Sequence, residues 1–369
     1  MSLAVDKLST VTDALIPGPE PAGGDPQVPG PEAASVTAAT PPRCPTRTRL
    51  YRDGKVAAEG FPAEDISELL DRHADATVWL DLLDPDQADL SIVTLEFGLH
   101  PLAVEDAIHD HQRPKLDRYR SHLFANMYAV DFDATTGELS SAEISTFITP
   151  RALITVRKSD FDVDTLLARW DTALPNVATG NVSFLLYGLL DAVVDGHYRT
   201  VEGLDDAIDE LENALFEDRP KIDIRRRGFE LRKSLVALRR VVSPMREVLS
   251  RILRNHWQTA LVAEGLEPYY QDVYDHVLRA TEWTESLRDL VTTILETNLT
   301  LQGNRLNVIT KMVTSWAAII AVPTAITGWY GQNLPYPGFA SSSGLVTSVV
   351  LIATISGGLY FTFKHKDWL

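Results

Sequence analysis

MVTSWAAIIAVPTAITGWYG, residues 312–331, contains no charged side chain, although 23% of the chain's 369 residues are charged and its formal net charge is −17. A second uncharged run, GLVTSVVLIATISGGLYFTF, occupies residues 344–363. A helix as long as either run spans about 30 Å, the thickness of the hydrocarbon core of a bilayer, because each residue adds about 1.5 Å. The two runs therefore predict two transmembrane helices, in preference to a hydrophobic hairpin buried in a soluble protein.

The residues around these runs predict the orientation of the chain. Lys311 precedes the first run and residues 364–369 form a basic tail, whereas the loop of residues 332–343 contains neither Lys nor Arg. The positive-inside rule therefore places both termini in the cytoplasm of a multi-pass protein of the cell (inner) membrane, with the loop outside. Two spans cannot enclose a water-filled path by themselves, so any pore requires several copies of the chain.

The composition of the chain excludes several classes of function. Its acidic balance argues against a nucleic-acid partner, which would need clustered Lys and Arg. The single cysteine, Cys44, excludes an internal disulfide framework and a cysteine-based zinc site. No Walker A, G-x-S-x-G, H-E-x-x-H or C-x-x-C pattern occurs, so we do not expect an enzyme.

The first 180 residues divide by composition into two parts. Residues 1–46 are rich in Pro, Gly and Ala and predict a disordered tail, because they cannot bury enough surface to offset the entropy of ordering. Residues 47–180 alternate strand-like runs, such as TVWLDLL and ALITVRK, with helical stretches, which predicts a cytoplasmic α/β domain. The pair Asp53-Gly54 near its start predicts the turn of a β-hairpin.

Residues 181–266 predict a charged helical hairpin. Residues 202–218 hold eight acidic side chains and no basic one, and residues 219–254 hold twelve basic and three acidic ones. Pro220 lies in the turn between the two segments. The two charged faces are either solvated surfaces that partly neutralise each other or an electrostatic funnel for cations.

Small and polar residues form a stripe along the first span, which we call the polar stripe. In the membrane half its members recur at steps of three and four residues: Asn307, Thr310, Thr314, Ala317, Ala321, Thr324, Gly328 and Gly331. Such steps place them on one face of a supercoiled helix, and the pattern continues back to Asp272, which predicts one helix over residues 267–331. Lipid does not favour Thr or Gly, so the membrane half is either a tight helix-packing face or the lining of a pore.

A pore lining explains both halves of the polar stripe, whereas a solvated face explains only the cytoplasmic half. The chemistry of the stripe suits a hydrated hard cation. Mg²⁺ gives up its water reluctantly, so rings of neutral amide and hydroxyl oxygens can hold its hydration shell without trapping the ion. Asn333 at the outer mouth and Asn307 at the inner mouth would supply such rings.

From about residue 48 to its end, the chain resembles the CorA family of magnesium channels. The resemblance rests on FGLHPLAVEDAIHDHQRPKLDRY, FITPRALITVRK, LLYGLLDAVVDGHYRTVEGLDDAIDELE, EPYYQDVYDHVLRATEWTESLRDLV, GNRLN and TGWYGQN. It implies a funnel-shaped homopentamer with an α+β cytoplasmic domain of αβα layers, followed by long stalk helices and two transmembrane helices. Residues 267–331 would be the stalk helix that continues as the pore-lining first span, and residues 344–363 the peripheral second span.

The resemblance also implies roles for residues of the pore. The family's Gly-Met-Asn motif at the outer mouth corresponds to Gly331, Gln332 and Asn333, with Asn333 carrying the selectivity role and Gln332 replacing Met. The inner pore asparagine corresponds to Asn307. The hydrophobic gate of the family corresponds to Thr310, Val313 and Ala321, and the pore lining would also include Thr314, Ala317, Thr324 and Gly328 of the polar stripe.

In the family, Mg²⁺ is both the transported ion and a regulator that cytoplasmic carboxylates bind between subunits. Asp106 and Asp272 correspond to that pair, and Glu105 with Asp191 or Asp195 would form a second site. Facing carboxylates repel each other unless a divalent ion neutralises them. Loss of the ion would therefore loosen the closed pentamer and shift the population between two states.

Two alternatives follow from departures from the family pattern. The loop LPYPGFASSS has no acidic residue to gather cations, whereas magnesium-type members usually have one, so the chain could transport Zn²⁺, Co²⁺ or Ni²⁺ with the same fold. If Gln332 abolishes transport, the chain would instead be a non-conducting, membrane-anchored Mg²⁺ sensor.

Overall fold

The structure is a computed structural model, and it describes residues 42–110, 112–159, 161–173, 181–217, 220–259, 262–263, 265–332, 335–339 and 341–369. The predicted tail lies outside the described residues up to position 41. Within its last positions, the backbone N–H of Arg43 donates a hydrogen bond of 2.7 Å to Oδ1 of Asp89.

Seven strands form one sheet in the order β2-β1-β3-β7-β6-β5-β4. The strands are β1 Thr46–Arg52, β2 Lys55–Glu59, β3 Thr77–Leu83, β4 Lys115–Arg118, β5 Leu123–Asp133, β6 Glu138–Ile148 and β7 Ala152–Arg157. Only β3 and β7 pair in parallel among these neighbours. Asp53 and Gly54 join β1 to β2 with φ angles of 50° and 67°, as a two-residue hairpin turn requires.

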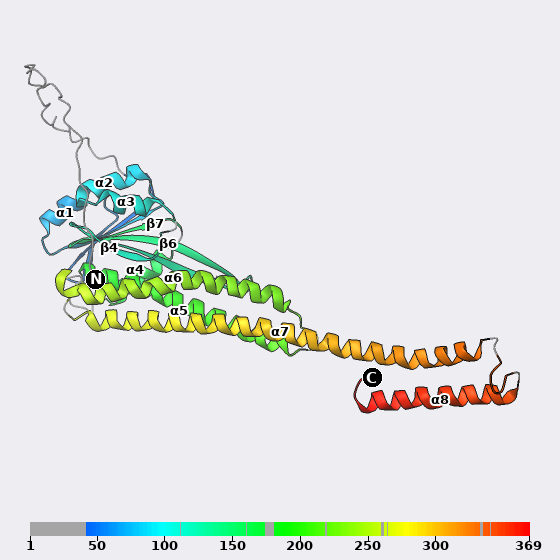
Figure 1. The fold of residues 1–369 in the computed structure, drawn as a ribbon. Helices are drawn as coiled ribbons and strands as arrows, with labels where there is room; N and C mark the ends of the chain where they lie inside the picture. Colours follow the sequence, from blue (N-terminus) through cyan, green and yellow to red (C-terminus); the bar gives the residue numbers. More distant parts are fainter. Residues whose placement is uncertain are drawn as a thin grey trace, which may run out of the picture. The chain divides into compact units, whose positions relative to one another are not determined.

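Helices cover both faces of the sheet (Figure 1). One face carries α1 Ile66–Arg72, α2 Gln87–Phe97 and α3 Pro101–Ile108, preceded by the 3₁₀ turn η1 Ala63–Asp65; the other carries α4 Val163–Ala173, α5 Val182–Leu215 and α6 Ile224–Thr259. The sheet separates two hydrophobic cores, the first against α1, α2 and α3 and the second against α4, α5 and α6. Because side chains alternate along a strand, Val78 and Leu80 of β3 lie in the first core and Trp79 lies in the second. The predicted αβα layering is confirmed.

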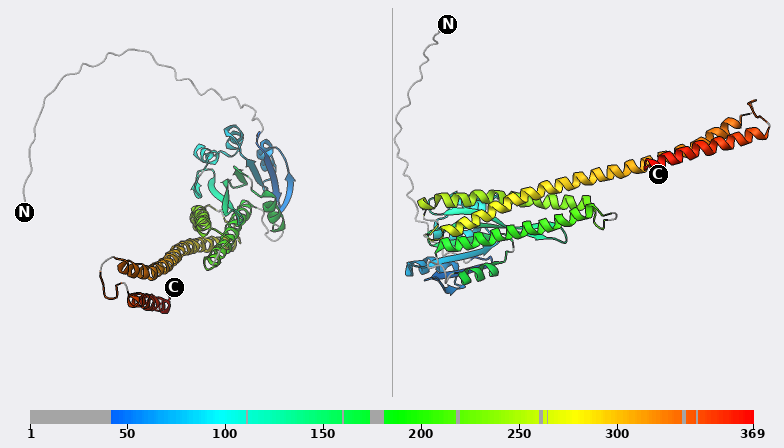
Figure 2. Two further views of the ribbon diagram at one scale, coloured as in Figure 1. Left: turned by 90° about the vertical axis from the view of Figure 1, so that its right-hand side faces the viewer. Right: turned by 90° about the horizontal axis from the view of Figure 1, so that it is seen from below.

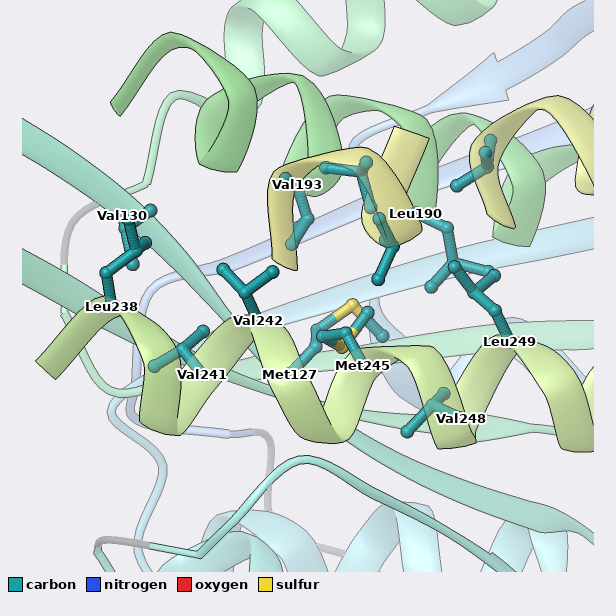
Figure 3. Packing of buried hydrophobic residues seen from close by; sticks show 14 of the residues in the cluster. Met127, Val130, Leu190, Val193, Leu238, Val241, Val242, Met245, Val248 and Leu249 are labelled. Atoms are coloured by element: carbon teal, nitrogen blue, oxygen red, sulfur yellow. The ribbon is translucent and has the colours of Figure 1, made fainter. Parts of the chain in front are cut away.

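The second core holds α6 against the sheet and against α5. Figure 3 shows side chains of α6 converging with residues of β5 and α5, and the labelled members are Met127, Val130, Leu190, Val193, Leu238, Val241, Val242, Met245, Val248 and Leu249. Most of these side chains are almost completely buried. The charged residues of α6 therefore lie on its outward face, as the amphipathic pattern predicts.

Two further helices complete the chain. The 64 residues of α7, Glu267–Tyr330, form one continuous helix, and α8, Ser342–His365, follows after the loop. The first part of α7 packs on α5 and α6, and its last part packs on α8 (Figures 1 and 2). Both helices contain an apolar window long enough to cross a membrane, and only 6% of each window is buried.

Pro323 lies inside α7 without ending it. A proline removes one backbone N–H from the helical ladder and usually bends a helix. The hydroxyl of Thr324 donates to the carbonyl of Ile320 at 3.0 Å, and the hydroxyl of Thr327 donates to the carbonyl of Pro323 at 2.8 Å. These side-chain bonds add donors to carbonyls on either side of the break, although the carbonyl that loses its N–H partner is that of Ile319.

Candidate functional site

One side of α7 is buried by other helices of the same chain, and we call it the buried seam. Its cytoplasmic members follow each other at steps of three and four residues and are Tyr270, Val273, Val277, Ala280, Thr284, Leu287, Val291, Ile294 and Asn298. They face α5 and α6. This spacing is that of a helix packed along a left-handed supercoil, so the seam fixes which side of α7 points away from its own chain.

The same seam continues against α8 in the membrane half. Ser315 is buried there, and Ile319, Val322 and Ile326 are partly buried. The facing side of α8 begins at the buried Gly344 and continues with partly buried residues that include Ser348, Ile352 and Ser356. Small residues on α8 let the two backbones approach closely, which is the usual basis of helix packing in lipid.

The polar stripe lies on the opposite side of α7. Its cytoplasmic members are Asp272, Asp275, Arg279, Glu282, Ser286, Asp289, Thr293, Glu296, Thr300 and Gly303, and each of them is exposed, as is each membrane member from Asn307 to Gly331. Val313 lies beside the stripe and its side chain is 62% exposed. At about 100° per residue, Ala317 and Thr324 of the stripe lie about 160–180° around the helix from the buried Ser315. Within one chain, α8 therefore leaves the stripe uncovered.

The hydroxyl groups of the stripe are oriented as acceptors. Thr310 Oγ1 donates its hydrogen to the carbonyl of Leu306 at 2.8 Å, and Thr324 Oγ1 donates to the carbonyl of Ile320 at 3.0 Å. Because each hydrogen is engaged with the helix, the oxygen presents lone pairs outward. Uncharged acceptor oxygens can attract the water shell of a cation without holding the ion tightly.

The outer end of α7 closes on Gly331 and Gln332. The N–H of Gly331 donates to the carbonyl of Thr327 at 2.8 Å, and the N–H of Gln332 donates to the carbonyl of Trp329 at 3.3 Å. A Cβ on Gly331 would lie 3.0 Å from the Thr327 carbonyl oxygen, so glycine suits this tight end. Both residues are exposed, and Asn333, the predicted selectivity residue, lies outside the described residues.

The described part of one chain holds no group of three or more His, Cys, Asp or Glu side chains that could bind a metal ion. Asp106 on α3 accepts a 2.6 Å hydrogen bond from Nζ of Lys115 on β4, which also lies 3.2 Å from Asp117. Asp272 on α7 lies 3.9 Å from Nδ1 of His276, and its side chain is 65% exposed. Since α3 and α7 lie on opposite faces of the sheet, Asp106 and Asp272 of one chain cannot share an ion (Figure 1).

The second predicted site joins Glu105 with Asp191 or Asp195, and its two aspartates lie close together on α5. Nη1 of Arg169 on α4 lies 3.2 Å from Asp191 and 2.7 Å from Asp195, in a groove of about 610 Å³. Burial, followed by the charge of Asp195, raises the pKa of Asp191, and the Arg169 guanidinium opposes this shift. Glu105 is exposed on α3, across the sheet, so the structure does not bring it to this pair within one chain.

Sequence reasoning missed the two cations, Lys115 and Arg169. Each meets its carboxylates from a different element, so no local spacing indicates the contact. The only sequence signal for such an ion pair is a basic residue close to the acidic one along the chain, and Lys115 is close to Asp106 in this sense.

The charged hairpin shows little mutual neutralisation. In the ranges that the structure describes, no ion pair joins the acidic side chains of α5 to the basic ones of α6. Arg251 of α6 pairs with Glu247 of the same helix at 2.9 Å, and Arg239 pairs with Glu285 of α7 at 3.2 Å. The idea that the two faces neutralise each other therefore gains no support from direct contacts.

Comparisons with known proteins agree with these features. The family described as CorA-like Mg²⁺ transporter protein matches residues 74–365. The cobalt/magnesium transport protein CorA of Thermotoga maritima is 31% identical over 313 residues, which cover 84% of this chain and 88% of the relative. The zinc transport protein ZntB of Yersinia enterocolitica is 26% identical over 309 residues, which cover 80% of this chain and 89% of that protein.

The fold is also found among solved structures. The complete structure of the CorA magnesium transporter from Methanocaldococcus jannaschii superposes with a TM-score of 0.71 at 22% identity, and the match covers 88% of this chain and 98% of that one. The match extends over nearly all of that chain, so the similarity includes the long helix and the two candidate membrane helices.

Proposed function

The chain belongs to the CorA-like Mg²⁺ transporter family of divalent-cation transporters, and on that premise we propose that it is a homopentameric channel for hydrated Mg²⁺. Five copies would place their α7 helices around a common axis. In this proposal the polar stripe lines the water path, Gly331, Gln332 and Asn333 form the selective outer mouth, and Thr310, Val313 and Ala321 form the gate.

The exposed polar stripe is the observation that carries this proposal. It stays uncovered by its own chain from Asp272 to Gly331. In lipid, an uncovered row of Thr, Asn and Gly gains nothing from the acyl chains, so water or other copies of α7 must meet it. A shared central path satisfies the oxygens of the stripe and explains why the row is continuous with a charged cytoplasmic half.

The domain limits follow from the same proposal. Residues 47–180 would form the cytoplasmic α/β domain, residues 181–266 the charged hairpin and residues 267–331 the stalk and pore helix. The loop of residues 332–343 would face outward, and residues 344–363 would form the peripheral span. Residues 1–46 and 364–369 would be cytoplasmic tails of a protein of the inner membrane.

We further propose that cytoplasmic Mg²⁺ closes the channel. Asp106 of one copy and Asp272 of the next would bind the ion between subunits, and Glu105 with Asp191 or Asp195 would form the second position. Carboxylate oxygens suit Mg²⁺, which prefers hard ligands and keeps several waters. The separation of α3 and α7 across the sheet supports a site that two copies share.

A second candidate function is transport of Zn²⁺, Co²⁺ or Ni²⁺ through the same path. Two observations favour it: the similarity to a zinc transport protein and a cobalt/magnesium transport protein, and the loop of residues 332–343, which lacks any acidic side chain. The non-conducting Mg²⁺ sensor is a third candidate, and it rests on Gln332 in place of Met.

Ion uptake by purified protein in proteoliposomes tests these proposals. We expect Mg²⁺ uptake that falls as the Mg²⁺ concentration on the cytoplasmic side rises, and a strong loss of uptake in Asn333→Ala. Robust Zn²⁺ uptake without Mg²⁺ uptake would replace the proposal by its second candidate. Absence of any uptake, with Mg²⁺ still bound in a manner that Asp106→Asn removes, would favour the sensor.

A further inference from the structure

Both groups of candidate regulatory carboxylates already contact a cation from their own chain. Lys115 contacts Asp106 at 2.6 Å, and Arg169 contacts Asp195 at 2.7 Å and Asp191 at 3.2 Å. We propose that Lys115 and Arg169 are tethered cations that compete with the regulatory divalent ion for these carboxylates. This inference rests on the proposed regulation by Mg²⁺ and adds the residues that set its working concentration.

The surroundings of Lys115 hold its ammonium group against Asp106. Its Nζ lies 3.2 Å from Asp117 and 5.6 Å from the centre of the Phe124 ring, and the side chain is only 22% exposed. The ammonium group of Lys115 is therefore positioned from several sides, unlike that of a free surface lysine.

Arg169 joins two carboxylates that lie one helical turn apart on α5. Without a cation between them, Asp191 and Asp195 would repel each other, and their partial burial would strengthen that repulsion. The field of Asp272, which reaches Asp191 from α7, adds to the negative charge at this position. Nη1 of Arg169 contacts a carboxylate oxygen of each aspartate. A guanidinium suits such a pair, because its donors lie in one plane and keep their positive charge.

A tethered cation and a directly bound divalent ion exclude each other at the same carboxylate. The ion would have to approach an oxygen that already accepts a short hydrogen bond from a positive group, and two cations at such distances repel strongly. Lys115, bonded to Oδ2 of Asp106, therefore opposes the binding of Mg²⁺ to this carboxylate. The same tethered charge weakens the repulsion between carboxylates when the ion is absent, so the closed assembly depends less on Mg²⁺ than it would with bare acids.

The test measures Mg²⁺ protection of the full-length protein, in nanodiscs, against limited proteolysis. Lys115→Met keeps the aliphatic stem and removes the charge, and we expect half-maximal protection at an about tenfold lower Mg²⁺ concentration, which corresponds to about 1.4 kcal/mol. Arg169→Met should shift the midpoint in the same direction. Lys115→Arg should restore the midpoint of the wild type, because it restores the charge.

Arg239→Met is the matched control. It removes the contact between Arg239 and Glu285, at 3.2 Å, and neither of these residues is a candidate ligand. Its midpoint should stay that of the wild type. Lys115→Gln provides a second charge-removing variant if Lys115→Met does not assemble. A midpoint that is unchanged or raised in the assembled charge-removing variants overturns the competition.

Asp106→Asn separates this inference from the regulation on which it rests. If Asp106→Asn abolishes Mg²⁺ protection while loss of the Lys115 charge leaves the midpoint unchanged, the competition fails and the regulation stands. If the wild type shows no Mg²⁺ protection, both fail. Uptake by the Asn333→Ala variant reports on the ion path alone, so the proposed transport is judged separately.

Discussion

The two sides of α7 run along the same helix and differ in what covers them. The buried seam meets α5 and α6 in its first half and α8 in its second, so its own chain accounts for its apolar and small residues. No other helix in the described part of the chain buries the polar stripe, whose members are all exposed from Asp272 to Gly331. Burial within one chain thus explains one side of the helix, and the other side requires water or further copies.

The polar stripe carries charged residues along the part of α7 that packs on α5 and α6, and only neutral residues along the part that packs on α8. Its cytoplasmic half carries charged residues such as Asp275, Glu282 and Asp289, whereas its membrane half is neutral. A charge in lipid is costly, but a small neutral oxygen at the wall of a water path is not. This change from charged to neutral residues is what the proposed water path along the stripe requires.

The largest effect is expected from two consecutive residues of α7, of which one belongs to the buried seam and the other to the polar stripe. Leu287→Ala removes a side chain of the buried seam that is 3% exposed and should lower the free energy of unfolding by about 2–5 kcal/mol. Ser286→Ala, one residue earlier on the polar stripe, should change it by less than about 0.5 kcal/mol. Denaturant unfolding of the detergent-solubilised protein measures both variants. Equal losses would break the distinction between the two sides.

A positive charge in the membrane half distinguishes the polar stripe from α8. Thr314→Lys should lower divalent-ion uptake about 100-fold with normal assembly, because a ring of fixed cations would repel the ion in a narrow path. Thr362→Lys places the same charge on an exposed position near the C-terminal end of α8 and should leave uptake within about twofold, since its long side chain can reach the interface. Uptake in proteoliposomes measures the effect, and similar losses in both variants would argue against a path along the stripe.

Removal of one hydroxyl group makes the same comparison with a smaller change. Thr324 and Thr354 are both exposed in the candidate membrane helices, and each donates to the carbonyl four residues earlier, at 3.0 and 2.8 Å. Thr324→Val should lower uptake about fivefold, because a ring of acceptor oxygens is lost, whereas Thr354→Val should have no measurable effect. The prediction fails if the α8 variant is the more damaging one.

The smallest expected effect is the pH dependence of stability that arises from His197 of α5. His197 of α5 is fully buried, its Nε2 lies 2.7 Å from the carbonyl of Tyr128, and burial lowers its pKa to about 4. The unfolded chain binds a proton at His197 more readily than the folded chain does. The contribution of the neutral, buried His197 to the free energy of unfolding is therefore complete above about pH 6.5 and is lost as the pH falls towards 4. From pH 7 to pH 6 the free energy of unfolding should fall by about 0.7 kcal/mol from this residue.

Unfolding of the wild type and of His197→Gln at both pH values checks this expectation. The variant should show a smaller pH dependence by that amount, whatever its absolute stability. An identical pH dependence in the two proteins would mean that His197 does not titrate on unfolding.

Sequence patterns reveal the features that depend on one element and miss those that depend on two. The two apolar runs, the polar stripe and the strands β3 and β7 follow from length, charge and side-chain alternation within single segments. The edge strand β4 has only four residues, KLDR, with no clear alternation, and the sequence does not reveal it. Its pairing with β5 places Lys115 beside Asp106, so the ion pair was hidden for the same reason.

The sequence predicts which residues share the polar face of α7, but it does not predict that this face is exposed. The steps of three and four residues identify a face, but a tight packing face and a pore lining share that period. The choice depends on where α8 packs, and contacts between helices arise from tertiary structure. Burial of Ser315 and partial burial of Val322, with Thr314 and Ala321 exposed, indicate which side α8 takes.

Thiol accessibility along α7 tests whether the polar stripe faces water in the assembled protein. The chain's single cysteine, Cys44, can be replaced by Ser, and single cysteines can then be introduced at positions 314, 317, 321 and 324 and, for comparison, at 315, 319, 322 and 326. In proteoliposomes, a membrane-impermeant thiol reagent should modify the first set, and permeating divalent ions should slow the reaction. Protection of the first set from the reagent, with modification no faster than in the second set, would contradict a water-filled path along this face.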